Sequence, residues 1–170
     1  PVLSFEACLL WGMKEDIEDG EFRIPFGVAR TVRQGTDVTI VAISSAVPQA
    51  VLAAQILETE GISAEIIDPR TLVPLDSLAI LNSVARTGRL VIADPANRTC
   101  GAAAEISAIV SELAFDCLRA PIIRVTTPDT HIPFSPAIEK QLYPDSIKIA
   151  EAVRKVTSAR IGAGAPARMN

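Results

Sequence analysis

The sequence predicts an α/β fold, a three-layer sandwich whose mostly parallel sheet carries one antiparallel edge strand. Apolar runs of strand length alternate along the chain with helical patterns of about a dozen residues, and Gly and Pro separate them. Few polar residues interrupt the apolar runs, which is typical of strands buried on both faces. Strands alternating with helices form right-handed crossovers, so we expect a parallel sheet covered on both sides.

Five segments are expected to form the sheet. Four are rich in β-branched and apolar residues, as buried strands require. The fifth, VARTVR, alternates polar and apolar residues and should lie at an edge, and the turn QGT after it predicts a hairpin-like connection to the next strand. The expected strands are 28–33, 37–44, 62–68, 89–94 and 121–127.

Helices are expected between and after these strands. Asp76 and Asp145 precede helical patterns and can accept backbone N–H groups as N-caps, and Ser45 can cap the first helix. Gly61 and Gly88 follow two of the patterns, where glycine commonly ends a helix. The expected helical segments are 45–61, 76–88, 102–118, a short helix opening at Ser135 and Pro136, and 146–156.

One domain accounts for residues 1–156. Residues 157–170 lose hydrophobic periodicity and gain Gly and Ala, so we expect a flexible C-terminal tail. The chain opens at Pro1 in an apolar, strand-like run without an initiator Met, so we expect either a cut in a longer chain or the edge of a crystallised fragment; a natural split subunit is the alternative to a fragment. The charged residues 12–25 should cross the surface as a loop.

Composition excludes several classes of function. With a net charge of −4 and Arg and Lys scattered along the chain, no basic surface is expected to attract nucleic acid. The apolar runs are much shorter than a membrane span. The three cysteines are far apart in sequence and form no C-x-x-C pair, so we expect reduced thiols in a cytoplasmic protein. A single histidine rules out sites that need two.

No known catalytic or nucleotide-binding motif follows a strand. G-x-G-x-x-G, G-x-x-x-x-G-K and G-x-S-x-G are all absent. We therefore assign no catalytic, cofactor-binding or metal-binding residue. Ligands of open α/β sheets collect at the carboxyl ends of strands, which makes four polar loops the places to search. These loops are Ser44–Ser45, Asp68–Arg70, Asp94–Gly101 and Thr126–His131.

Five polar residues are candidate contacts with an anion or a partner protein. In IIDPRTLVPLD (66–76), Asp68 can accept backbone N–H groups of the turn, and Arg70 can pair with Asp68 or reach another anion. Arg98 offers a second guanidinium after a strand. His131 lies in a Pro-rich turn and is expected at the surface or at an interface. The candidates are Asp68, Arg70, Arg98, Arg119 and His131.

Six stretches of sequence carry a resemblance to a known family: VRQGTDVTIVAIS, EGISAEIIDPRTLVPLD, VARTGRLVIAD, AEI at 104–106, RAPIIRVTTPDT and IPFSPAIEKQLYPD. Their order and spacing resemble the C-terminal, transketolase-C-like domain of the beta subunit of thiamine-diphosphate-dependent 2-oxoacid dehydrogenases. Pyruvate, branched-chain 2-oxoacid and acetoin dehydrogenases have such subunits. The resemblance covers essentially residues 1–156, and the motifs D-x-R-T-L-x-P-L-D and P-D-T-x-I-P make it specific.

The resemblance implies a parent enzyme that decarboxylates a 2-oxoacid oxidatively with thiamine diphosphate and Mg²⁺. In that family an alpha-subunit domain and the beta subunit's N-terminal domain hold the cofactor, so this chain alone is expected to bind none and to be inactive. The implied partners are the alpha subunit, a second beta subunit and a lipoyl-bearing acyltransferase. A homodimer is expected where those partners are missing. The alternatives are another transketolase-superfamily domain and a standalone anion-binding or protein-binding module.

The chain departs from the family pattern at three places. Relatives have G-G-F-G-A-E-I where this chain has CGAAAEI (100–106), so Gly101 alone would give backbone freedom and Cys100 places a thiol in the turn. Relatives usually have Gly after the first central strand, where this chain has Ser44 and Ser45. Arg119 replaces an acidic residue that in some relatives helps to bind the acyltransferase. The reversed charge would repel a basic partner.

Overall fold

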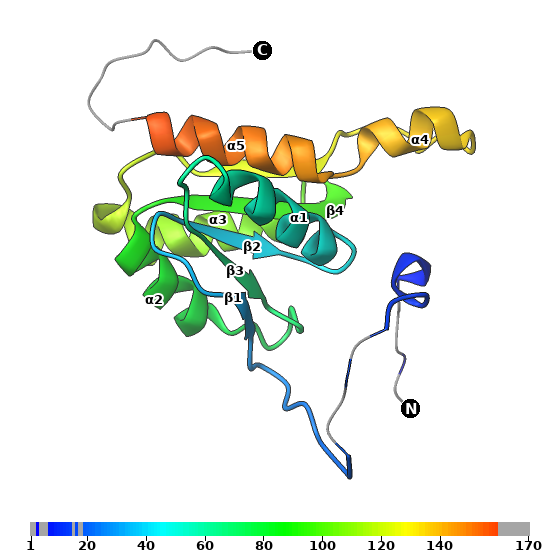
Figure 1. Ribbon diagram of the computed structural model, residues 1–170, viewed down its shortest axis with the longest axis horizontal. Coiled ribbons are helices and arrows are strands. Elements are labelled where there is room, and N and C mark those ends of the chain that lie inside the picture. Colours follow the sequence, from blue (N-terminus) through cyan, green and yellow to red (C-terminus); the bar gives the residue numbers. More distant parts are fainter. Residues whose placement is uncertain (1–2, 4–6, 15, 17–18, 160–170) are drawn as a thin grey trace.

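A computed structural model describes residue 3, residues 7–14, residue 16 and residues 19–159 (Figure 1). A five-stranded sheet lies between two layers of helices. The predicted three-layer α/β sandwich is confirmed. In chain order the elements are η1 (Cys8–Leu10), β1 (Arg30–Arg33), β2 (Val38–Ala42), α1 (Ala46–Glu58), β3 (Ala64–Asp68), α2 (Ser77–Thr87), β4 (Leu90–Asn97), α3 (Ala102–Leu113), η2 (Phe115–Cys117), β5 (Ile123–Thr127), α4 (Pro136–Leu142) and α5 (Ser146–Ser158).

The strands lie in the order β1-β3-β2-β4-β5. Strands β2 to β5 are mutually parallel, and β1 pairs antiparallel with β3 at the edge, as predicted. The hairpin predicted from the QGT turn is wrong, because β2 has β3 and β4 as its neighbours and leaves no side open for β1. The turn residues predict that the chain reverses direction, but they do not determine which strand β1 pairs with.

The turn after β1 packs against the backbone of β3. A Cβ added to Gly35 would lie 2.2 Å from both the carbonyl carbon of Ala64 and the backbone nitrogen of Glu65. Next to it, the Asp37 N–H donates to the Ser63 carbonyl at 2.8 Å, and the Asp37 carboxylate accepts the Ser63 N–H at 2.7 Å. The turn therefore needs a residue without a side chain because two backbones approach closely there.

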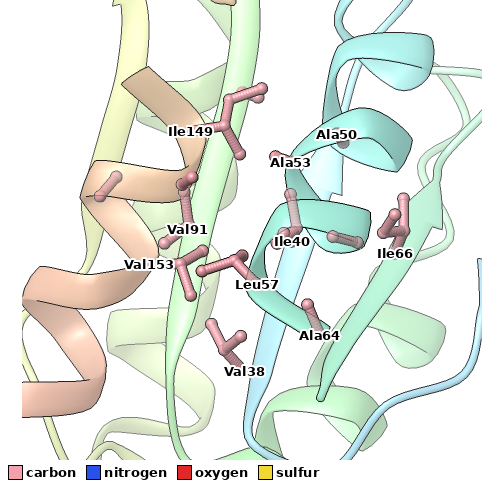
Figure 2. Close-up of a cluster of buried hydrophobic side chains, with 14 of the residues drawn as sticks. Val38, Ile40, Ala50, Ala53, Leu57, Ala64, Ile66, Val91, Ile149 and Val153 are labelled. Atoms are coloured by element: carbon pink, nitrogen blue, oxygen red, sulfur yellow. The ribbon is translucent and has the colours of Figure 1, made fainter. Parts of the chain in front are cut away.

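Helices α1 and α5 cover one face of the sheet (Figure 2). Ile40, Leu57, Val91 and Val153 are completely buried between these layers. The buried face of α1 is mostly alanine, which lets the helix backbone approach the sheet closely. Its buried residues are Ala46, Ala50, Ala53, Ala54 and Leu57.

Helices α2 and α3 cover the opposite face. Consecutive strand residues enter different cores: Ile40 packs under α1 and α5, whereas Val41 packs under α2 and α3. The same alternation holds for Ile66 and Ile67 on β3. Side chains along a strand point to alternate faces, so apolar residues at every position are needed when both faces are covered. This explains the uninterrupted apolar runs of the sequence.

Two predicted boundaries change at the carboxyl side of the chain. Helix α3 ends at Leu113, not at 118, because Ala114 leaves the helical conformation at φ −141° and η2 follows. Helix α5 continues to Ser158, so the first two residues assigned to the tail are helical. The rest of the predicted tail, from residue 160, lies outside the described residues.

Two predictions near the amino end are wrong. Residues 8–10 form a single 3-10 turn rather than part of a strand, and residues 1, 2 and 4–6 of the strand-like run lie outside the described residues. Ser45 makes no side-chain cap for α1; the Ile43 carbonyl accepts the Ala46 N–H at 3.0 Å instead. Asp76 and Asp145 are N-caps as predicted, accepting the N–H groups of Ala79 and Lys148. Within the described part of the chain, no helix has the length and apolarity to cross a membrane.

The close approach at residue 35 gives a test of the sheet arrangement. Gly35→Ala should lower the free energy of unfolding by about 1–3 kcal/mol, because the added methyl overlaps backbone atoms of β3 that cannot move aside. Gly12→Ala is the matched control, since nothing lies within 4 Å of a Cβ there. Urea denaturation followed by circular dichroism measures both, and equal stability of the two variants would contradict the β1–β3 packing.

Candidate functional site

The carboxyl ends of β2, β3 and β4 lie along one edge of the sheet, where ligands of α/β proteins usually bind. Each end turns through a non-glycine residue in the left-handed conformation: Ser44 has φ 53°, Arg70 has φ 57° and Cys100 has φ 59°. Such a conformation costs on the order of 1 kcal/mol per residue and persists only where neighbouring contacts hold it. The backbone freedom expected of Gly101 is therefore used at Cys100, since Gly101 itself is extended.

Asp68 holds the turn after β3, as predicted. Its Oδ1 accepts the N–H of Arg70 at 2.9 Å, and the Pro69 carbonyl accepts the N–H of Thr71 at 2.6 Å. No ion pair joins the Arg70 guanidinium to Asp68 or to another residue in the described ranges, so the ionic alternative for this pair is not realised. Arg70 is exposed.

Asp76 joins this turn to the segment that precedes β1. One of its oxygens accepts the Ala79 N–H at 3.1 Å and caps α2, while the other accepts the Ala29 N–H at 2.9 Å. Nearby, the Thr71 hydroxyl accepts the N–H of Gly27 at 2.9 Å. The chain before β1 is thus fastened along the loop between β3 and α2.

A cavity of about 720 Å³ opens between this turn and the residues around η1. Ile43 and Ser44 line it at the end of β2, and Asp68 and Arg70 at the end of β3. Residues 10–14 contribute to the opposite wall, except Gly12. The structure therefore brings two of the five candidate residues, Asp68 and Arg70, to one concave surface.

Asp94 occupies the amino end of α3. It is 2% exposed within β4, where its Oδ1 accepts the Ala96 N–H at 2.9 Å and its Oδ2 accepts the Ala103 N–H at 3.0 Å. A Cβ on Gly101 would lie 2.4 Å from the Asn97 carbonyl oxygen, so the tight loop requires this glycine. A helix amino end is a common anion site, but here the chain's own carboxylate fills it.

The other long helices are also capped from within. Asp145 accepts the Lys148 N–H at 2.8 Å, and the Gln49 side chain accepts the Ser146 N–H at 3.2 Å at the start of α5. In α1, the N–H of Val47 donates to the Ser44 carbonyl, and Pro48 has no N–H to offer. No long helix in the described chain presents an uncapped first turn suited to a phosphate.

The loops after β4 and β5 are tied together by Thr99 and Asp129. The Thr99 hydroxyl and N–H donate to the two carboxylate oxygens at 2.6 and 2.9 Å. These hydrogen bonds, led by that of the hydroxyl, hold the pKa of the Asp129 carboxyl below its ordinary value of 3.8. Arg98 and Arg124 lower the pKa further through their charges.

The remaining candidates do not form one site. Arg98 is exposed in the loop after β4, where its carbonyl accepts a hydrogen bond from Arg124. His131 is exposed after β5. Arg119 precedes β5 and therefore lies at the amino edge of the sheet, where its N–H donates to the Gly88 carbonyl at 2.7 Å and its side chain covers Gly88. The candidates are divided between opposite edges.

A buried polar network between β3 and α2 was missed by sequence reasoning. Glu65 is 1% exposed, and Arg86 Nη2 donates to its two oxygens at 2.9 and 2.6 Å. The Ser83 hydroxyl also donates to Glu65, and Thr39 shares hydrogen bonds with Ser83 and Thr87 at 2.6 and 2.8 Å. The available signal was a lone glutamate in an apolar strand, followed by polar residues at helical spacing.

The described residues include no group of three His, Cys, Asp or Glu side chains that could hold a metal ion. Cys8, Cys100 and Cys117 are free thiols, the first two exposed. Because internal hydrogen bonds satisfy the amino ends of α2, α3 and α5, the chemistry available at this edge is recognition by exposed arginines and apolar side chains. No nucleophile and base lie together among the candidates.

Comparison with known families decides the relationship of the chain. The family model described as transketolase, C-terminal domain, matches residues 27–149, which contain all five strands of the sheet. The chain belongs to this family. The resemblance found in the sequence motifs is thereby confirmed.

Curated relatives include beta subunits of an acetoin oxidoreductase and of pyruvate dehydrogenase. The beta subunit of acetoin:2,6-dichlorophenolindophenol oxidoreductase from Cupriavidus necator is 46% identical over 155 residues, which is 91% of this chain and 46% of that protein. The beta subunit of the pyruvate dehydrogenase E1 component from Leifsonia xyli is 43% identical over 154 residues, or 90% and 45%. The chain spans about half the length of these relatives and corresponds to the transketolase C-terminal domain of such a subunit.

Solved structures share the fold. A split-gene transketolase, described as an inactive beta4 tetramer, matches with a TM-score of 0.72 and 26% identity over 86% of this chain and 46% of that one. A transketolase from Pichia stipitis matches with a TM-score of 0.55 at 19% identity, over 78% of this chain and 18% of that one, which shows likeness of fold alone.

The cap on α3 can be tested by stability. Asp94→Ala should lower the free energy of unfolding by about 1–3 kcal/mol, because the buried N–H of Ala103 and the partly buried N–H of Ala96 lose their acceptor. Asp94→Asn should lose less, since its amide oxygen still accepts one of them. Asp116→Ala removes an exposed carboxylate of η2 and is the control. If Asp94→Ala proved as stable as Asp116→Ala in urea denaturation, Asp94 would not be the cap.

The loop contact can be tested by pH. Since the folded-state pKa of Asp129 is lowered, its contribution to stability is present above the unfolded value and is lost as pH falls through the folded value. Thr99→Val should raise the pKa of Asp129 toward 3.8, measured by NMR titration of its carboxyl carbon. The stability difference from wild type should be greatest above about pH 5 and shrink under acid conditions. An unchanged pKa would contradict the Thr99 contact.

Proposed function

We propose that this chain serves subunit assembly in a thiamine-diphosphate-dependent enzyme that oxidatively decarboxylates a 2-oxoacid or cleaves acetoin. The observation that carries the proposal is the 40–46% identity to beta subunits of acetoin oxidoreductase and pyruvate dehydrogenase over about nine-tenths of the chain. Its partners would be an alpha subunit and a second beta subunit. The carboxylates that cap the first turns of α2, α3 and α5 support a role in assembly rather than in phosphate chemistry.

Thiamine diphosphate and Mg²⁺ would belong to the parent enzyme and not to this domain. The described residues do not fit the cofactor, because they contain no cluster of metal ligands. Asp76, Asp94 and Asp145 place negative charge at the first turns of α2, α3 and α5, where a diphosphate would otherwise bind. We assign no catalytic step to this chain.

Exposed apolar side chains support a role in subunit contact. On the segment before β1 and the loop after β3, Phe26 is 80% exposed and Val73 is 93% exposed, with Val28 and Leu72 beside them in sequence. We call these four residues the strap surface. Helix α4 extends beyond the helix layers without a buried residue (Figure 1). Solvent-exposed apolar patches commonly mark protein interfaces.

Self-association is part of the proposal. The strap surface and α4 would drive the isolated chain to pair with a second copy when no alpha subunit is present. The structural match to a split-gene transketolase described as a beta4 tetramer supports this expectation.

Free thiols at Cys8, Cys100 and Cys117 support the proposed cytoplasmic location.

Docking of a lipoyl acyltransferase is a separate matter. Arg119 is exposed and its aliphatic stem lies over Gly88, so its charge faces solvent at the amino edge. A basic docking partner would meet repulsion there, whereas an acidic one would be attracted. We therefore propose that this edge does not recruit a basic acyltransferase domain.

The strap surface provides the test of assembly. Val73→Asp should weaken both self-association and binding to the alpha subunit at least tenfold, about 1.4 kcal/mol, because a charge would be buried in the contact. Leu113→Asp makes the same change at a site on α3 that is 69% exposed and should leave assembly unchanged. Analytical ultracentrifugation measures both. Normal assembly of Val73→Asp, or equal loss in both variants, would sink the proposal.

Calorimetry tests the assignment of the cofactor to other parts of the parent enzyme. Titration of the chain with thiamine diphosphate and Mg²⁺ should release no heat of binding, because aspartates occupy the helix amino ends. The full enzyme with its alpha subunit is the positive control. Tight binding to this chain alone would refute the assembly role.

A further inference from the structure

The cavity beside η1 has the size and composition of a small-molecule site. Its volume of about 720 Å³ lies in the usual range for ligand pockets, about 300–1,000 Å³. Apolar side chains form much of its lining, including Val47 at the start of α1, Leu72 after β3 and Trp11 on the opposite wall. Such walls suit the apolar body of a ligand rather than a bare ion.

The charged groups in the lining are mostly basic. The lining contains three basic side chains, those of Lys14, Arg30 and Arg70, and one carboxylate, that of Asp68. Asp68 already accepts the Arg70 N–H, whereas the Arg70 guanidinium has no acidic partner among the described residues. Arg30 makes contacts of its own, so Arg70 is the group placed to pair with a ligand anion. A guanidinium binds a carboxylate or sulfonate through two parallel hydrogen bonds.

The backbone holds this arrangement in place. Ser44 and Arg70, both in the left-handed conformation, line the same cavity from adjacent strands. The hydrogen bond from the Arg70 N–H to Asp68 fixes the turn and therefore the origin of the guanidinium side chain. The start of α1 offers no N–H to an anion here, since Pro48 lacks one and Val47 donates to Ser44. Recognition must come from the side chains.

We propose that this cavity binds a small organic anion with an apolar body, its charged group paired with Arg70 and its body against Leu72, Val47 and Trp11. The cavity borders the strap surface and shares Leu72 with it, whereas Phe26, Val28 and Val73 lie outside its lining. It does not use a helix amino end, unlike the phosphate sites of nucleotide-binding α/β folds. Charge and shape together predict that an anionic aromatic compound binds better than an uncharged one of the same outline.

Trp11 is the chain's only tryptophan and serves as the reporter. Titration with 8-anilinonaphthalene-1-sulfonate should quench the fluorescence of Trp11, because energy transfer from Trp11 excites the bound probe. The uncharged N-phenyl-1-naphthylamine, with the same aromatic outline, should bind at least tenfold more weakly. Arg70→Ala should raise the Kd of the sulfonate at least tenfold, and Arg70→Lys should restore part of the affinity because the charge remains.

Two further variants separate the cavity from other surfaces. Lys155→Ala removes a positive charge from the exposed end of α5 and should leave the sulfonate affinity unchanged. Leu72→Trp should block the cavity from its rim and abolish binding without harming the fold, because Leu72 is 46% exposed. Equal binding of the charged and uncharged probes, unchanged affinity of Arg70→Ala, or unchanged affinity of Leu72→Trp would each overturn the proposal.

Discussion

The first turn of a helix leaves backbone N–H groups without partners, and the way this chain satisfies them shapes the whole domain. Asp76 and Asp145, directly before α2 and α5, accept these groups, and Asp94 accepts one at α3 from within β4. Asp76 and Asp94 also accept N–H groups outside the helices, so each carboxylate fastens a loop while it caps. The strand-to-helix connections are held rigid as a result, and the carboxyl edge of the sheet carries its own anions.

Parallel sheets of this order usually offer a ligand crevice between the two central strands, where successive connections leave in opposite directions. Here that position lies between β2 and β4, and the buried Asp94 fills it. The cavity lies instead at the carboxyl ends of β2 and β3. At the amino edge, the Arg89 side chain donates to carbonyls of Val156 and Asp37 and so holds the end of α5 against the sheet.

The sequence predicted the layers well because burial on two faces leaves a strong apolar pattern in strands such as 62–68. It predicted the caps Asp76 and Asp145 because an N-cap is a local property. It failed where the answer depends on distant residues: the partner of β1, the location of Arg119, and the carboxylate role of Asp94 at α3. The motif around Asp68 predicted the turn but left open whether Arg70 pairs with Asp68 or reaches outward, since a guanidinium's partner can come from anywhere in space.

The network around Glu65 has a consequence for the alignment of α2 on the sheet. Its carboxylate is buried and meets Ser83 and Arg86 one turn apart on the helix. Sliding α2 by one turn would keep much of the apolar contact but would leave the buried Glu65 carboxylate without the Arg86 guanidinium, at a cost of about 3–5 kcal/mol. The network therefore fixes the register of α2 on the sheet. A chimaera in which a foreign sequence replaces α2 would keep the fold only if that sequence retained Ser83 and Arg86, the two partners of Glu65.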